Sequence, residues 1–189
     1  MDDLKLWRRL REGDQKALKE VYDLYAGNLA NYAKKFTHNT ELIEDSIHDL
    51  FVSIWQKKEN LSDTDSIIKY LCVSLRRELI RRVKQSMRVT SFDYSENTDV
   101  YFSLTIEDLI VQDENDQAKQ LKLKEAFKEL SSRQREAIFL KYYKEMSYEQ
   151  ICEVMDINYQ SVRNLISKGI IDLKRIIGFV YLIFSIYLL

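Results

Sequence analysis

Residues 147–168 read SYEQICEVMDINYQSVRNLISK, and the architecture of the C-terminal third of the chain follows from this stretch. Ser147 can cap a short helix whose apolar residues share one face. These residues are Ile151, Val154 and Met155. After a short turn at 156–157, Asn158 can cap a second helix that we expect to run to about residue 175. Two helices joined by so tight a turn form a helix-turn-helix pattern.

The second helix of this pattern presents small polar and basic side chains on its exposed face, next to its N-terminus. The candidates for contacting DNA are Arg163, Asn164, Ser167 and Lys168. The major groove of DNA admits one α-helix, and the base edges there offer donors and acceptors that such side chains match. A helix N-terminus also favours nearby phosphates. The pattern favours DNA binding, although a plain helical bundle has the same apolar periodicity.

The composition predicts that the rest of the chain is helical as well. The 189 residues include no proline and only four glycines, and an all-β fold needs many more turn residues than this. We therefore predict an all-α protein of one or two small domains. The sequence holds no HExxH, GxSxG or phosphate-loop motif and no cluster of cysteine and histidine. It thus predicts no catalytic residue, no metal site and no cofactor.

The net charge of −1 hides blocks of opposite sign. Residues 66–90 contain seven basic residues and one acidic residue, and residues 119–146 contain eight basic and four acidic residues. Between them, residues 91–118 contain eight acidic residues and no basic residue. Basic blocks suit a polyanionic partner, because phosphate contacts release counterions. Solvated helix faces have the same composition, so the blocks alone do not decide between the two.

The N-terminal half is predicted to be a series of amphipathic helices. Asp14 can cap a helix that runs to about Tyr25, and Thr40, which follows Asn39, can cap the next. In this second helix, TELIEDSIHDLFVSIWQ, one face is apolar and is expected to be buried: Ile43, Ile47, Leu50, Phe51 and Ile54. The opposite face is acidic: Glu41, Asp45, His48 and Asp49.

A further helix is predicted from near Ser66, after a polar loop at 57–66. Its buried stripe consists of Ile68, Leu71, Leu75, Leu79 and Val83. A basic stripe lies on a different face, with residues spaced four, three and four apart: Arg77, Arg81, Lys84 and Arg88. Arg76 and Arg82 widen this stripe.

The sequence predicts a division into four segments. A helical domain at 1–90 is followed by an acidic linker at 91–117, with a short helical turn at 106–111. A second helical domain covers 118–175, and 176–189 form an uncharged tail, IIGFVYLIFSIYLL. As a helix the tail would be about 21 Å long, short of the ~30 Å hydrocarbon core of a membrane. We therefore expect the tail to pack on the protein itself or on a partner.

Three stretches resemble the extracytoplasmic-function (ECF) group of bacterial sigma-70 RNA polymerase sigma factors. IEDSIHDLFVSIW, at 43–55, resembles the helix that binds core polymerase, with His48 at a position where the group usually has Gln. YLCVSLRRELIRR, at 70–82, resembles the helix that engages the minus-ten element, with Arg77 where Asn is usual. Residues 130–175, with RQRE, YY, SYEQI and VRNLI, resemble region 4 of the same group.

The resemblance implies a transcription initiation factor, with three sets of site residues. Asp45, His48 and Asp49 would bind the clamp helices of the largest polymerase subunit. Tyr70, Arg76, Arg77 and Arg81 would hold and help to open minus-ten DNA. Arg163, Asn164, Ser167 and Lys168 would read the minus-thirty-five element. The implied partners are core RNA polymerase, promoter DNA and an anti-sigma factor, either free or membrane-bound, with no small-molecule substrate.

Two other functions are consistent with parts of the sequence. A polymerase-independent helix-turn-helix regulator would bind a duplex site alone and would need no acidic docking helix, so IEDSIHDLF disfavours it. A membrane-tethered interaction protein would use the tail.

The N-terminus, MDDLKLWRRL, does not resemble a secretory signal, and Cys72 and Cys152 are spaced too far apart for a disulfide framework. We therefore expect a cytoplasmic protein.

Overall fold

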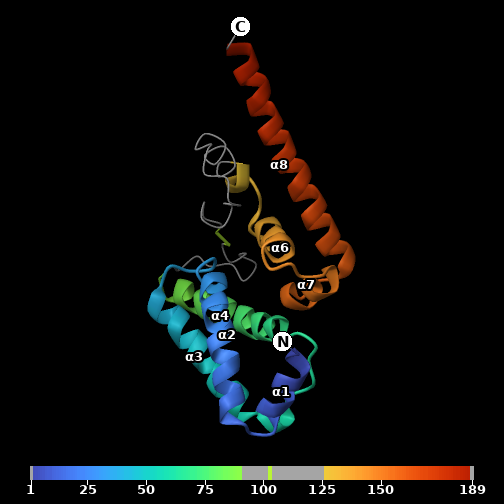
Figure 1. The fold of residues 1–189 in the computed structure, drawn as a ribbon. Helices are drawn as coiled ribbons and strands as arrows, with labels where there is room; N and C mark the ends of the chain where they lie inside the picture. Colours follow the sequence, from blue (N-terminus) through green and yellow to red (C-terminus); the bar gives the residue numbers. More distant parts are fainter. Residues whose placement is uncertain (1, 91–101, 104–125, 188–189) are drawn as a thin grey trace. The chain divides into compact units, whose positions relative to one another are not determined.

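The computed structural model describes residues 2–90, 102–103 and 126–187, with the backbone alone at 87–90 and 176–187. All regular secondary structure in the described residues is helical, which confirms the all-α prediction (Figure 1). The chain divides into two compact units, Met1–Tyr101 and Phe102–Leu189. Most of the predicted linker, including the predicted helical turn at 106–111, lies outside the described residues.

In the described residues of the N-terminal unit, four α-helices and one short 3₁₀ helix form a bundle (Figure 1). In chain order these are α1 (Asp3–Arg11), α2 (Gln15–Ala33), α3 (Thr40–Gln56), η1 (Lys58–Asn60) and α4 (Ile67–Thr90). Helices α2, α3 and α4 pack on one another, and α1 packs on α2, η1 and α4. The bundle buries the two apolar faces predicted for α3 and α4, except that Ile68 is only half-buried.

Two helix boundaries in this unit differ from the sequence predictions. Asn39, not Thr40, caps α3, because its Oδ1 accepts the backbone N–H of Leu42 at 3.0 Å. Helix α2 does not end near Tyr25 but continues to Ala33. The added turns bury Leu29 and Tyr32 completely, and this burial outweighs the roughly 1 kcal/mol that a glycine such as Gly27 costs inside a helix.

Asp3 joins three helices of the N-terminal unit through one carboxylate. Its Oδ2 accepts the backbone N–H of Ile67 at 2.9 Å, which caps α4, and its Oδ1 accepts the Tyr25 hydroxyl of α2 at 3.0 Å. Burial, together with the bond to Asp3, raises the pKa of Tyr25 to about 12. A cap supplied from 64 residues away cannot be found by reading the residues next to the helix.

The C-terminal unit contains the predicted helix-turn-helix. Helix α6 (Ser132–Tyr142) precedes α7 (Tyr148–Met155) and α8 (Tyr159–Tyr187), which form the motif. Ser131 and Ser147 each begin a helix with a complete capping box, and the Asn158 Oδ1 accepts the N–H of Ser161 at 2.8 Å. The caps at Ser147 and Asn158 confirm the two helix starts predicted for the motif. Helix α8 continues past residue 175 to Tyr187, into the uncharged tail.

Close packing holds α8 against α6 and α7. A Cβ atom at Gly169 would lie 2.8 Å from Cδ1 of Ile138, so the absent side chain lets α8 approach α6. Val162 and Ile166 are buried on the inner face of α8, and Ile151 and Val154 are buried on α7. No helix of the described part of the chain has the length and apolar character that crossing a membrane requires.

Candidate functional site

The acidic face of α3 lies on the surface of the N-terminal unit. Asp45, His48 and Asp49 are all exposed, and the spacing of three and one residues places them on one side of the helix. Val52, one turn further on, is 37% exposed and extends this face with an apolar side chain. Asp45 and His48 form no ion pair with any described residue. The predicted docking face is therefore acidic, accessible and bordered by an apolar contact.

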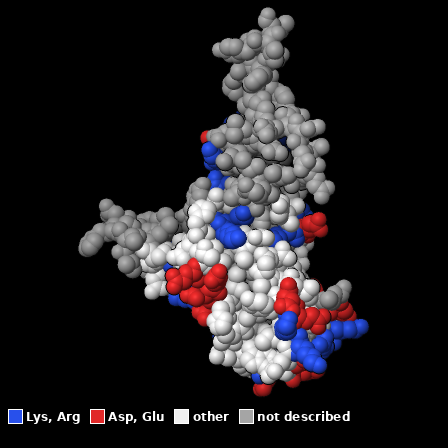
Figure 2. All heavy atoms as spheres, turned by 60° about the vertical axis from the view of Figure 1, so that its left-hand side comes forward, with Lys and Arg blue, Asp and Glu red and all other residues white. Residues whose placement is uncertain are grey.

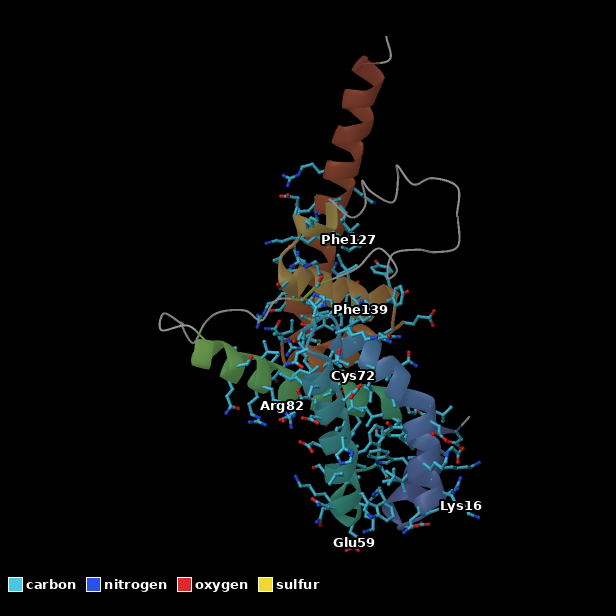
Figure 3. The ribbon with its side chains drawn as sticks, turned by 90° about the vertical axis from the view of Figure 1, so that its left-hand side faces the viewer. Lys16, Glu59, Cys72, Arg82, Phe127 and Phe139 are labelled. Atoms are coloured by element: carbon cyan, nitrogen blue, oxygen red, sulfur yellow. The ribbon has the colours of Figure 1, made fainter. Side chains whose placement is uncertain are left out.

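Asp49 belongs instead to a charge network that joins α3 to α4. Arg82 of α4 forms ion pairs with both Asp49 and Glu78. Arg81 binds Glu78 with two nitrogens, at 3.0 Å from Nε and 2.6 Å from Nη2. The bonds from Arg81 and Arg82 lower the pKa of Glu78 to about 2. We call these four residues, Asp49, Glu78, Arg81 and Arg82, the α3–α4 charge network (Figure 3, where Arg82 is labelled).

A cleft of about 450 Å³ runs beside this network, between α3 and α4. Its lining includes Asp45 from the acidic face and both Arg81 and Arg82 from the basic helix. A residue predicted to bind polymerase and a residue predicted to bind DNA thus border the same cleft. On the view in Figure 2, acidic and basic side chains lie side by side in one group at the lower right, and uncharged surface separates this group from a mainly acidic one at the left.

The remaining residues predicted to bind minus-ten DNA lie in different environments along α4. Arg77 is exposed and forms no ion pair with a described residue, whereas Arg76 is half-buried. The ring of Tyr70 lies 4.9 Å from that of Trp7, centroid to centroid, and burial raises the pKa of its hydroxyl. From the sequence, Arg82 is predicted only to widen the basic stripe. Its pairing with Asp49 is not predicted, because Asp49 lies 33 residues away on another helix. The side chain of Arg88 lies outside the described residues.

The loop that joins α3 to α4 is held against α1. The indole N–H of Trp7 donates to the carbonyl of Ser62 at 2.9 Å. Asp63 forms ion pairs with Arg8 and Arg11, and the bond from Arg8 is the main cause of its lowered pKa. These contacts fix the course of the chain as it enters α4, which carries the basic residues.

The exposed face of α8 carries all four residues predicted to read the minus-thirty-five element. Arg163, Asn164, Ser167 and Lys168 are exposed together along its first turns. The Gln160 amide donates to Asn164 Oδ1 at 3.0 Å, so the two amides are aligned along the helix. Neither Arg163 nor Lys168 forms an ion pair with a described residue. Their charges are therefore available to phosphates or base edges.

A backbone hydrogen bond and a contact between two aromatic rings hold the turn before α8. Asp156 adopts a left-handed backbone with φ of +55°, and the N–H of Ile157 bonds the carbonyl of Cys152 at 3.1 Å. The rings of Tyr148 on α7 and Tyr159 on α8 lie 5.5 Å apart across the turn. Among the described residues, no three His, Cys, Asp or Glu side chains are grouped so that they could hold a metal ion.

Both units match known protein-family models. Residues 21–89 match Sigma-70 region 2, and residues 120–173 match Sigma-70, region 4. The two matches together cover about two thirds of the chain, in family order. The chain belongs to the sigma-70 family. This sigma factor is therefore a transcription initiation factor that directs RNA polymerase to promoters.

Individual relatives agree with the ECF resemblance. The ECF RNA polymerase sigma factor SigK of Mycobacterium sp. (strain JLS) is 22% identical over 178 residues, which are 92% of this sigma factor and 89% of SigK. The RNA polymerase sigma factor YlaC of Bacillus subtilis (strain 168) is 21% identical over 159 residues, 84% of this chain and 91% of YlaC.

Solved structures show the same fold. CnrH, solved in complex with the cytosolic domain of CnrY, aligns with a TM-score of 0.62 at 16% identity, over 94% of this chain and 98% of CnrH. The sigma factor RpoE from Bartonella quintana, solved with the anti-sigma factor NepR, aligns with a TM-score of 0.62 at 20% identity, over 86% and 98%.

Proposed function

We propose that this sigma factor divides promoter recognition among three helices. The acidic face of α3 binds core RNA polymerase, α4 holds the minus-ten element, and the exposed face of α8 reads the minus-thirty-five element. The observation that carries the proposal is that a single chain presents exposed Asp45 and His48 on α3 and exposed Arg163 and Lys168 on α8. None of these four side chains forms an ion pair with a described residue. The first pair suits a basic protein surface and the second pair suits DNA.

On α3, Asp45 and His48 supply the polar contacts, and Val52 supplies an apolar one. An interface of this kind combines an apolar centre with charges at its rim. Asp49 contributes in a second way, because its ion pair with Arg82 orients α3 against α4. We therefore expect Asp45 and His48 to contact polymerase directly, while Asp49 also holds the neighbouring helix.

On α4, Arg77 is available for a phosphate at once, whereas Arg81 must first leave Glu78. The exchange replaces one charge-assisted pair by another, so its net cost is small. The half-buried positions of Tyr70 and Arg76 allow contact with a base or a phosphate only at their exposed edges. The opening of minus-ten DNA is then a capture of unstacked bases rather than a catalysed reaction. This role requires no catalytic residue from the chain.

On α8, Asn164 and Ser167 can meet base edges, while Arg163 and Lys168 can meet either bases or phosphates. We further propose that the protein works in the cytoplasm, where polymerase and promoter DNA are found, and that an anti-sigma factor is a partner. The likeness to the fold of RpoE, which was solved with the anti-sigma factor NepR, supports this partner.

The proposal is tested by recovering core polymerase from host lysate with tagged full-length protein. The variants are Asp45→Arg, which reverses an unpaired charge on the acidic face, and Glu59→Arg, which reverses an exposed charge on η1 away from that face. Wild type and Glu59→Arg should recover the large polymerase subunits equally. Asp45→Arg should recover roughly tenfold less, as expected for a like charge placed in an interface.

Equal recovery by Asp45→Arg and Glu59→Arg would exclude α3 as the docking helix. Loss of polymerase from both variants would show that net charge, rather than the acidic face, governs binding. Circular dichroism of each variant checks that the helical content is unchanged.

A further inference from the structure

Phe102 lies in the middle of the acidic segment that separates the two promoter-reading units in the sequence, yet it is a core residue of the C-terminal unit. Its side chain is 1% exposed. Its ring centroid lies 5.7 Å from that of Phe139 on α6, and Phe139 in turn stacks on Tyr143 at 5.2 Å (Figure 3, where Phe139 is labelled). A linker that did not pack on the C-terminal unit would leave such an aromatic ring exposed to solvent.

Hydrogen bonds secure the backbone of Phe102 as well. Its carbonyl accepts Nε of Arg135 at 2.7 Å, and its N–H donates to Oγ of Ser132 at 3.3 Å. Arg135 is 5% exposed, and its Nη1 donates to the carbonyl of Leu130 at 2.7 Å. One buried guanidinium therefore joins Phe102 to the chain that leads into α6. Both polar groups of the Phe102 backbone are satisfied by residues of α6.

We propose that Phe102 is a positioning residue that limits the distance over which the two units can act on one promoter. This inference rests on the proposed assignment of α4 and α8 to the two promoter elements. With Phe102 anchored, residues 91–101 alone join the end of α4 to the C-terminal unit. Their fully extended reach is about 40 Å, whereas a connection running on to Ala126 would reach about 120 Å.

The length of this connection should set which promoter spacings are used. The effective concentration of one unit at its DNA element falls to near zero when the connecting chain cannot span the distance. Each added base pair moves the two elements about 3.4 Å further apart. An anchored Phe102 therefore favours a narrow range of spacer lengths, and its release widens the range toward longer spacers.

The test uses holoenzyme reconstituted from core polymerase and the full chain. The template is a promoter that this holoenzyme selects from a randomised DNA library, remade with spacers lengthened one base pair at a time. We compare the ratio of transcription from a spacer lengthened by about three base pairs to transcription from the original spacer. Phe102→Ala should raise this ratio roughly tenfold, because the chain that connects the two units becomes longer. Phe102→Leu, which keeps an apolar side chain, should retain the narrow range.

Two insertions separate positioning from a loss of stability. A six-residue Gly-Ser insertion after residue 96 lengthens the connection before the anchor, and the same insertion after residue 114 adds chain only behind it. The first should widen the range of spacers and the second should leave it unchanged. Equal widening by both insertions, or none by the first, would overturn the proposal.

A distance measurement on the chain alone distinguishes failure of the anchor from failure of the proposed function. Spin labels at Lys19→Cys on α2 and Lys174→Cys on α8, in a Cys152→Ser background, report the separation of the units. Phe102→Ala should broaden the distance distribution toward longer values, and an unchanged distribution would refute the anchor. If wild-type holoenzyme selects no promoter, the proposed function fails and the spacing role fails with it. The spin labels then still decide whether Phe102 anchors the segment.

Discussion

The N-terminal unit and the first turns of α8 use their charged side chains in opposite ways. In the N-terminal unit, arginines and carboxylates bind one another across helices, as in the α3–α4 charge network and the pairing of Asp63 with Arg8 and Arg11. On α8, Arg163 and Lys168 face outward without an ion pair to a described residue. The C-terminal unit relies instead on local caps and on the buried Arg135.

Under the proposed roles of α4 and α8, this difference affects how each surface would bind DNA. A basic side chain without a partner binds a phosphate with no internal contact to break, so α8 is ready to bind as it stands. On α4, Arg81 would have to exchange Glu78 for the nucleic acid, so we expect a smaller contribution from this residue. Substitutions on α8 should therefore have larger effects on promoter binding than matched substitutions on α4.

The largest effect is expected from Arg163→Ala combined with Lys168→Ala. Loss of two DNA contacts should reduce promoter-directed transcription by roughly 10- to 100-fold and lower the slope of log affinity against log salt by about 2. Core polymerase binding should be unchanged, because the acidic face of α3 is intact. Run-off transcription over a salt series, with polymerase pull-down alongside, measures both.

The matched control removes two exposed cations from α2, Lys16 and Lys19. This double variant has the same net charge as the α8 variant, so any shared loss reflects charge alone. If the two double variants lose the same activity, α8 has no special role in reading DNA.

An intermediate effect is expected from Asp3→Ala, which tests the cross-helix ties of the N-terminal unit. The substitution removes the cap on Ile67 and the bond from the Tyr25 hydroxyl, so we expect a loss of about 2–3 kcal/mol in the free energy of unfolding. Both tryptophans, Trp7 and Trp55, lie in this unit. Their fluorescence during urea denaturation therefore reports on this unit alone.

Asp23→Ala is the control for Asp3→Ala. Asp23 is exposed, and its one ion pair with a described residue is with Lys19 one turn away, so its loss should cost less than about 0.5 kcal/mol. If Asp3→Ala and Asp23→Ala had the same urea denaturation midpoint, the cap on α4 would contribute nothing to stability.

The features that sequence reasoning predicted correctly depend on nearby residues. The caps at Ser147 and Asn158 and the buried faces of α3 and α4 all depend on residues within one or two turns. The helix-turn-helix and the family resemblance followed from the same local patterns. The roles of individual site residues stay predictions, although Arg163, Asn164, Ser167 and Lys168 do share one exposed face.

What the sequence did not indicate are contacts between distant residues. Asp3 caps a helix 64 residues away, Arg82 bonds Asp49 across 33 residues, and Arg135 bonds Phe102 across another 33. No local propensity distinguishes these side chains from solvated ones. Phe102 also stands in a segment without periodicity, so a single aromatic residue there gave no sign of burial.

The smallest effect is expected from Glu78→Gln, which removes the carboxylate that holds Arg81 and Arg82. The folded pKa of Glu78 is about 2, below the ordinary value of 4.5. A lowered pKa stabilises the fold above the unfolded value, and this stability is lost as the pH falls from 4.5 toward 2. Because the side chain is 27% exposed, we expect a loss of about 1 kcal/mol at pH 7.

Urea denaturation of wild type and Glu78→Gln, followed by tryptophan fluorescence, measures this loss. The difference in free energy of unfolding between the two proteins should be largest at pH 7 and should decrease as the pH falls toward 3. Glu59→Gln, at an exposed position without an ion pair to a described residue, should match wild type throughout.

Glu78→Gln also removes the carboxylate partner of Arg81, so that Arg81 becomes unpaired like Arg163 and Lys168 on α8. Duplex DNA binding by the variant should then become steeper in salt by about one phosphate contact. A difference in free energy of unfolding at pH 7, with no change in the slope of log DNA affinity against log salt, would mean that Arg81 supports the fold of the N-terminal unit and does not contact DNA.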